Sequence, residues 1–344
     1  MTIHPLAPTG RHNPPAIDTA GTAQKYRSRI LNLDTRSILV SRLDDSDQAR
    51  DLTVPANCGG FGRIRHFRRG DGQRWPCNPL PIDPASRGLG LPPSDALEAQ
   101  VFQNAACAWR CWYCFVPYNL LSADERRARW MTADDMLDLF LAERQQPRVI
   151  DLTGGSPDLT PEWIAWFMEA MVKRGLEKDF YLWSDDNLSA DFFWNLAPEH
   201  KEIIGSYRMY GRVTCFKGFD AESFAFNTAA SSDEFERQLA RFSRLAGSRI
   251  DLYAYVTLTS PYRDDLETRI AQFVDRLCSI HANLPLRTVP LEIQAFSPVL
   301  PRLDTSREQA LEQQQRAITA WKEALQKRYS SEELAMPITE VRLD

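Results

Sequence analysis

The sequence lacks the features that would place the chain in or across a membrane. None of its apolar stretches approaches the length of a transmembrane helix, and its first residues contain no signal-peptide core. It has no excess of positive charge either: the formal net charge is −5, so we expect neither nucleic acid nor an acidic membrane as a partner. Its seven cysteines, an odd number with three clustered, do not indicate a disulfide framework. We therefore expect a cytoplasmic protein.

The composition is that of an ordinary globular protein. With 43% hydrophobic and 25% charged residues over 344 positions, the chain is long enough for one large α/β domain with additions. We predict a flexible arm over residues 1–30, because this stretch is rich in Pro and Thr and has no apolar period. A Pro- and Gly-rich extension of irregular structure follows over 31–97. The core is expected over 98–300, and a C-terminal helix and tail over 301–344.

The extension contains a basic cluster. Residues 37–40 are expected to form a strand or hairpin, whereas residues 55–93 are expected to be loop throughout because Gly and Pro are frequent there. The cluster is either a solvated face or a site for a phosphate, a carboxylate or a nucleic-acid backbone. Within it, Arg68 and Arg69 are our candidates for substrate contact. The whole cluster comprises Arg63, Arg65, His66, Arg68, Arg69 and Arg74.

From residue 98 onward, short apolar runs alternate with amphipathic helices. Such alternation predicts βαβ units and a parallel sheet, with functional loops at the carboxyl ends of the strands. Helices are expected after each strand but the last. The six expected strands are 98–106, 149–152, 180–183, 207–216, 249–258 and 291–296.

Three cysteines lie at C-x3-C-x2-C spacing directly after the first expected strand. Cys107, Cys111 and Cys114 would place three thiolates in one tight loop. Such a loop can hold three irons of a cubic iron–sulfur cluster and leave the fourth iron open, as a catalytic metal site requires. A zinc knuckle usually needs four ligands, and only one C-x2-C pair is present. Buried, reduced core cysteines would not need this spacing, so we favour the cluster.

With Tyr113 as the aromatic residue before the last cysteine, the motif resembles the C-x3-C-x-aromatic-C signature of the radical SAM superfamily. The resemblance extends over roughly 98–300 and implies a partial (β/α)6 TIM-like barrel. It also implies a [4Fe–4S] cluster and S-adenosylmethionine, whose reductive cleavage gives a 5′-deoxyadenosyl radical that abstracts a hydrogen from a substrate. The backbone around Tyr113 and Phe115 would contact the adenine, and a flavodoxin or ferredoxin would supply the electron.

Two further strand ends resemble cofactor contacts of the same superfamily. Residues 153–157 read Thr-Gly-Gly-Ser-Pro and are similar to its Gly-Gly-Glu-Pro motif, although a serine replaces the glutamate. This resemblance implies that the methionine amino group is seated by Gly154, Gly155 and Ser156. After the third strand, a polar group is the candidate for the ribose or the carboxylate of the cofactor, with a helix N-cap cluster as the alternative. That group comprises Ser184, Asp185 and Asn187.

The segment after the fourth strand resembles the glycyl-radical-enzyme activases. Lys217 matches the lysine of their Asp-x-Lys segment and is a candidate for substrate contact, although Cys215 replaces the aspartate. The resemblance implies a glycine in a protein or peptide as substrate, whereas the basic cluster favours a nucleotide-like or other anionic small molecule. Cys215 and Tyr210 are candidates for returning a hydrogen atom to a product radical, with buried packing as the alternative. Outside the enzymes, the alternative is an iron–sulfur or zinc-binding scaffold protein.

Overall fold

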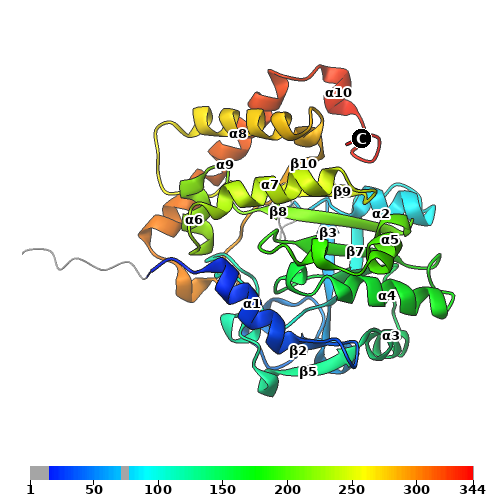
Figure 1. Cartoon of the computed structure of the whole chain (residues 1–344). Coiled ribbons are helices and arrows are strands. Elements are labelled where there is room, and N and C mark those ends of the chain that lie inside the picture. Colours follow the sequence, from blue (N-terminus) through cyan, green and yellow to red (C-terminus); the bar gives the residue numbers. More distant parts are fainter. Residues whose placement is uncertain (1–14, 71–76, 344) are drawn as a thin grey trace, which may run out of the picture.

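The computed structural model describes residues 15–70 and 77–343, and within them a curled sheet of seven strands forms the centre of the molecule (Figure 1). The strand order is β10-β9-β8-β7-β6-β4-β3, and every neighbouring pair is parallel except β3 and β4. This α/β architecture confirms the predicted partial (β/α)6 barrel. Its parallel strands are β4 (Ala96–Phe102), β6 (Val149–Leu152), β7 (Tyr181–Asp186), β8 (Tyr210–Phe216), β9 (Leu252–Val256) and β10 (Thr288–Pro290).

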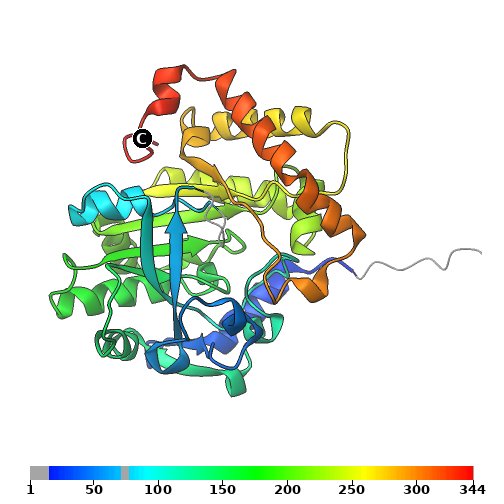
Figure 2. The same cartoon turned by 180° about the vertical axis from the view of Figure 1, so that it is seen from behind.

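Helices connect the parallel strands and cover the outer face of the sheet (Figures 1 and 2). A capping box is present at the start of the first of them, where the side chains of Thr132 and Asp135 accept hydrogen bonds from each other's backbone N–H groups. The long C-terminal helix α9 packs against α8, and the ring centres of Phe273 and Trp321 lie 6.2 Å apart across that contact. The helices that follow β4 in the chain are α3 (Ala133–Leu141), α4 (Glu162–Lys173), α5 (Pro198–Ser206), α6 (Ala221–Thr228), α7 (Glu234–Ala246), α8 (Leu266–Ile280), and, after the last strand, α9 (Thr305–Gln326) and α10 (Ser331–Ala335).

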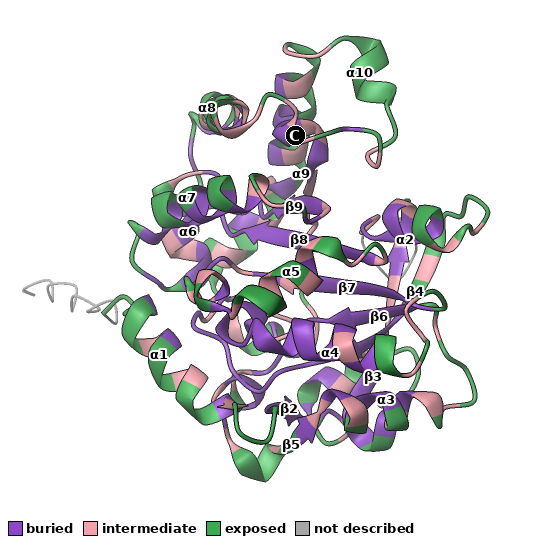
Figure 3. Cartoon of the chain, turned by 45° about the vertical axis from the view of Figure 1, so that its right-hand side comes forward, coloured by how far each residue is buried: buried purple, intermediate pink, exposed green. Residues whose placement is uncertain are grey.

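Buried residues run along the strands of the sheet (Figure 3). Side chains alternate between the two faces of a strand, so Tyr181, Trp183 and Asp185 all point to the inner face of β7. Aromatic residues fill one end of the barrel interior, where the ring centres of Trp183 and Tyr253 lie 5.6 Å apart. Polar residues such as Asp185 take the same face toward the carboxyl ends of the strands, which leaves room for a site at that end.

The predicted flexible arm is wrong for its second half, because α1 (Thr19–Ile30) is a helix. Asp18 caps the helix, and Arg27 binds Glu162 of α4 through two hydrogen bonds of 2.6 and 3.0 Å. The indole of Trp109 donates to the hydroxyl of Thr19 at 3.0 Å. These contacts with distant residues hold a helix that has little apolar period of its own. The first 14 residues of the arm lie outside the described part of the chain.

The prediction that residues 55–93 are loop throughout is also wrong. This stretch contains β3 (Gly62–Arg68), which pairs antiparallel with β4, and the helix α2 (Ile82–Leu89). The charged residues of β3 hid its strand pattern. A second sheet combines β1 (Leu31–Asn32), β2 (Ser37–Ser41) and β5 (Ala128–Thr132), and its middle strand confirms the strand expected at 37–40.

The last strand of the barrel lies earlier than predicted. β10 ends at Pro290, and the expected strand 291–296 is an extended segment without ladder pairing. This segment runs along the open side of the barrel (Figure 2) and lines the cavity described below. Among the described residues, none of the helices combines the length and apolarity needed to span a bilayer.

Candidate active site

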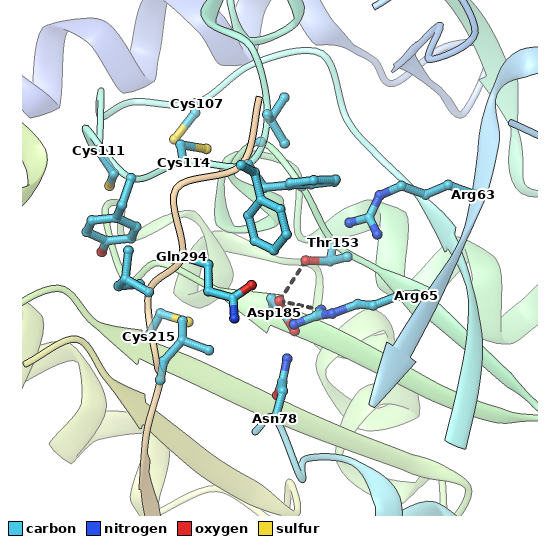
Figure 4. Close-up of a pocket in the computed structure, with 18 of the residues that line it drawn as sticks. Arg63, Arg65, Asn78, Cys107, Cys111, Cys114, Thr153, Asp185, Cys215 and Gln294 are labelled. Carbon is cyan, nitrogen blue, oxygen red and sulfur yellow. Dashed lines mark hydrogen bonds and ion pairs between the residues drawn. The ribbon is translucent and has the colours of Figure 1, made fainter. Parts of the chain in front are cut away.

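The carboxyl ends of the parallel strands surround a cavity of about 260 Å³ (Figure 4). Active sites of α/β barrels lie at this end, because the strand-to-helix loops converge there. Its walls are the cysteine loop, the glycine turn after β6, the ends of β7 and β8, the strand β3 and the segment 291–296. The cavity thus combines the predicted motifs and part of the predicted basic cluster with the segment 291–296, which was not predicted to contribute.

All three cysteines of the motif line this cavity and lie close together at one end of it (Figure 4). The loop that holds them is fixed by side chains that bond its carbonyl groups. Arg110 donates to the carbonyl of Cys107 at 2.7 Å, and Tyr118 donates to that of Cys111 at 2.9 Å. The carbonyl of Cys114 accepts from Arg302, in the C-terminal part of the chain, at 2.8 Å. Each cysteine is therefore held in place by its backbone, which leaves the sulfur atoms for a ligand.

Cys107 and Cys111 are buried, and Cys114 is half-buried. Among the described residues, no three His, Cys, Asp or Glu side chains converge so as to hold one metal ion. A zinc ion requires all its sulfur ligands within about 2.3 Å of one point, whereas a cubic cluster binds each thiolate to a different iron. Burial raises the pKa of Cys107 and raises that of Cys111 to about 12. Such thiols become thiolates on binding a metal that supplies positive charge.

Two glycines form the turn after β6 and face the same cavity. Gly154 and Gly155 have φ values of 76° and 62°, in the left-handed region that glycine adopts without strain. A Cβ on Gly155 would lie 1.9 Å from the side-chain oxygen of Asn104 and 2.4 Å from the carbonyl of Ala106. Only glycine fits there, so the bare backbone of this turn forms part of the cavity wall.

Ser156, which follows the two glycines, is fully buried and does not line the cavity. Its hydroxyl donates to the sulfur of Cys107 at 3.1 Å. The side-chain amide of Asn187 donates to the same hydroxyl at 2.9 Å and to the carbonyl of Gly155 at 3.1 Å. Ser156 therefore connects the glycine turn with the cysteine loop and the end of β7.

The three polar candidates after the third predicted strand divide between two faces. Asp185 and Asn187 line the cavity, whereas Ser184 is fully buried on the opposite face and shares a 2.7 Å hydrogen bond with the hydroxyl of Tyr210. Tyr210, too, lies away from the cavity, although Cys215 on the same strand lines it. The alternation of strand side chains separates Ser184 from Asp185.

Asp185 belongs to a buried ionic group that sequence reasoning did not find. Arg65 of β3 donates to Asp185 at 3.0 Å and to Asp151 of β6 at 2.8 Å, and Thr153 donates to Asp185 at 2.7 Å. Burial and the charge of Asp185 raise the pKa of Asp151 to about 7, against the effect of Arg65. Two carboxylates share one guanidinium here. The sequence did contain one sign of this group, because Asp151 is the single acidic residue in the otherwise apolar run 149–152.

The basic cluster of the extension also divides. Arg63 and Arg65 point from β3 into the cavity (Figure 4), whereas Arg68 and Arg69 do not line it. Arg69 forms ion pairs with Asp83 and, at 3.7 Å, with Asp95. The period-two spacing of Arg63, Arg65 and Phe67 was the signal for the inner face of this strand.

Aromatic and basic residues complete the cavity wall. The hydroxyl of Tyr113 shares a 3.0 Å hydrogen bond with Thr257, and the ring of Phe115 meets that of Phe296 edge to face at 5.0 Å. Lys217 is buried beside Cys215 and Cys111. Burial alone would lower the pKa of Lys217, but the neighbouring thiols and Tyr113 outweigh it and raise the pKa.

Comparison with known families gave a match in the central part of the chain. Residues 104–196 match the family model described as the radical SAM superfamily, and this range includes the cysteine loop, the glycine turn and the end of β7. Residues 104–196 are thus similar to the radical SAM superfamily, and they make up about a quarter of the 344 residues. A comparison with curated protein sequences found no match.

Solved structures of low similarity include two of Streptococcus suis SuiB. The one bound to the precursor peptide SuiA has 13% sequence identity and a TM-score of 0.42, and the match covers 65% of this chain and 46% of that chain. The one bound to S-adenosylmethionine has 14% identity and a TM-score of 0.39, with 65% and 48% covered. The matched part of this chain thus spans less than half the length of either neighbour.

Proposed function

We propose that this protein is a radical SAM enzyme. It would bind a [4Fe–4S] cluster through Cys107, Cys111 and Cys114 and bind S-adenosylmethionine beside it. The cluster and cofactor, when bound, supply a 5′-deoxyadenosyl radical by reductive cleavage of the sulfonium. The observation that supports this proposal is that three cysteine sulfurs and a turn of two glycines face one cavity at the carboxyl ends of the parallel strands.

The residues around the cavity are suited to bind and orient the cofactor. The glycine turn presents bare backbone to the methionine amino group, and Asp185 and Asn187 present polar atoms to the ribose or the carboxylate. Thr153 and Arg65 hold the carboxylate of Asp185 in one orientation by the hydrogen bonds described above. The backbone around Tyr113 and Phe115 would contact the adenine. Positioning determines selectivity, because a primary radical reacts with the nearest C–H bond.

The substrate that fits the cavity best is an anionic small molecule, nucleotide-like or otherwise. Two arginines of β3 face the cavity, and this strand belongs to the N-terminal segment outside the matched family range. A glycine of a protein or peptide is the second candidate, since Lys217 of the activase-like segment also lines the cavity. In either case, a flavodoxin or ferredoxin is the reductant we expect.

The proposal is tested with anaerobically reconstituted protein, dithionite and S-adenosylmethionine. We expect 5′-deoxyadenosine to form even without substrate. Cys111→Ala should remain folded and lose both the brown chromophore and the nucleoside. Cys278→Ala is the matched control, because this half-buried cysteine of α8 lies outside the cavity and should leave both unchanged. Normal cluster formation without any nucleoside would favour the iron–sulfur scaffold instead, and zinc in place of iron would exclude both.

A further inference from the structure

The two arginines that β3 presents to the cavity differ in their partners. Arg65 is neutralised by Asp151 and Asp185 at 2.8 and 3.0 Å. Arg63 lies two residues earlier on the same face, is 9% exposed, and forms no ion pair with any residue of 15–70 or 77–343. Its Nε atom is buried without a hydrogen-bond partner in the same part of the chain. One of two neighbouring buried cations is thus compensated and the other is not.

An uncompensated buried guanidinium is unfavourable for folding. Removing a cation from water costs several kcal/mol unless hydrogen bonds and an opposite charge replace the solvent. Burial, and to a smaller degree the charge of Arg65, lower the pKa of Arg63 to about 10, which still leaves it charged at neutral pH. The carboxylates whose charges act on Arg63, Asp151 and Asp185, are already bonded to Arg65. A group that breaks the pairing rule in this way at a cavity is expected to serve a ligand.

The orientation of Arg63 favours a ligand with oxygen atoms. Its guanidinium lies over the ring of Phe115, 5.2 Å from the ring centre, and Phe115 is itself held by Phe296. An arginine that stacks on an aromatic face keeps its in-plane N–H groups available for a second partner. Those groups match the spacing of carboxylate and phosphate oxygens, which they bind in a bidentate manner.

We infer that Arg63 binds an oxyanion, a carboxylate or a phosphate, of the substrate of this enzyme. The inference rests on the proposed function and assigns the chemical class of the substrate. The site would place that oxyanion at the wall of the cavity formed by β3, beside Phe115 and near Cys114. The remainder of the substrate would then extend over the glycine turn and the end of β7, where the cofactor is proposed to bind. Arg65 acts as a positioning residue through Asp185, and Arg63 as the anion contact.

The test measures anion binding to the full reconstituted chain, with and without S-adenosylmethionine. The probes are inorganic phosphate and acetate, and acetamide serves as the neutral analogue of acetate. We expect at least one anion to bind wild type by calorimetry, and Arg63→Gln to weaken that binding about tenfold or more, as loss of a charge-assisted bond would. Arg63→Lys should restore part of the affinity. Arg126→Gln is the matched control, since this arginine is 89% exposed and outside the cavity.

Thermal unfolding separates a ligand site from a structural role. Arg63→Gln removes a buried charge that has no partner among the described residues, so its ligand-free protein should unfold at the same temperature as wild type or higher. A lower unfolding temperature for both Arg63→Gln and Arg63→Lys would indicate a structural arginine and overturn the inference.

Three other outcomes would also overturn it. These are the absence of anion binding by wild type, equal binding by wild type and Arg63→Gln, and a tenfold loss of S-adenosylmethionine affinity in Arg63→Gln. The last would assign Arg63 to the carboxylate of the cofactor. Failure of the proposed function differs from failure of this inference. In the first case, wild type would bind anions through Arg63 and yet form no 5′-deoxyadenosine. The anion that binds with the higher affinity, acetate or phosphate, identifies whether the substrate group is a carboxylate or a phosphate.

Discussion

The hydroxyl of Ser156 donates a hydrogen bond of 3.1 Å to the sulfur of Cys107. Ser156 stands where the superfamily motif has a glutamate, and its own oxygen accepts from the amide of Asn187 at 2.9 Å. The serine therefore does more than remove a carboxylate from this position. It places a neutral donor against one of the three sulfurs proposed to bind the cluster.

The first prediction concerns the reduction potential of the cluster. Hydrogen bonds to cysteine sulfur stabilise the more negative, reduced state. Ser156→Ala should therefore lower the potential. The decrease should be at most about 60 mV, because a hydrogen bond contributes a net of about 0.5–1.5 kcal/mol, which is about a tenfold change in equilibrium constant, and a tenfold change corresponds to 59 mV for one electron. A redox titration followed by electron paramagnetic resonance measures this shift. Ser41→Ala removes a buried hydroxyl that bonds only backbone carbonyls, and it should leave the potential unchanged. An unchanged potential in both variants would contradict the role of Ser156.

The second prediction compares two glycines of equal φ. Gly155 and Gly90 both have φ of 62°, so replacing either by alanine costs about 1–3 kcal/mol of backbone strain. A Cβ on Gly155 also collides with Asn104 and Ala106, whereas one on Gly90 meets nothing within 4 Å. Gly155→Ala should reduce 5′-deoxyadenosine formation about 100-fold, since a displaced turn misplaces the cofactor. Gly90→Ala should retain it. Equal activities, measured by chromatography of the nucleoside, would show that the turn does not seat the cofactor.

The third prediction tests the ionic group that joins β3 to the barrel. Arg65→Met leaves Asp151 and Asp185 without their shared cation, and Asp151 is fully buried. Breaking a buried pair costs about 3–5 kcal/mol, so the free energy of unfolding in urea should fall by about 3 kcal/mol. Adding Asp151→Asn should recover part of that loss, because it removes the buried acid whose ionisation is opposed by burial and by Asp185. No recovery in the double variant would mean that Arg65 stabilises the protein through packing on Phe67 instead.

The fourth prediction concerns pH. Arg174, the residue that ends α4, donates to Asp134 and Asp138 of α3, each at 2.6 Å, and it holds the pKa of Asp134 below its usual value. A carboxylate with a lowered pKa in the folded state stabilises it above the unfolded-state pKa, near 4, and loses that effect as the pH falls. Both acids are largely exposed, so Arg174→Ala should cost only about 0.5 kcal/mol at pH 7.

This cost should disappear in acid. As the pH falls from about 4 to below the folded-state pKa of Asp134, the unfolding free energies of wild type and Arg174→Ala should converge. Arg129→Ala serves as the control, because this exposed arginine forms no ion pair within the described ranges 15–70 and 77–343. A difference that stays constant down to acid pH would show that Arg174 acts by packing rather than by charge.

Sequence reasoning predicted the barrel well because its signals are local. The parallel strands are covered on both faces, so their sequences are largely apolar runs, such as 149–152 and 252–256. It failed for α1 and β3, whose stability comes from partners far away in the chain. Arg27 finds its carboxylate 135 positions later at Glu162, and Arg65 finds its partners at Asp151 and Asp185. Neither ion pair produces a periodic pattern in the sequence around the arginine, so neither could be predicted from local sequence.

The spacing of Cys107, Cys111 and Cys114 by itself determined the most specific statement about this protein, because three sulfurs within eight positions must share one loop. The tertiary structure decided which polar residues reach that loop. It placed Asp185 toward the cavity and Ser184 away from it, and it selected Arg63 rather than Arg68 from the basic cluster. The physical reason is that neighbouring side chains of a strand point to opposite faces, and only the folded sheet shows which face is the inside of the barrel.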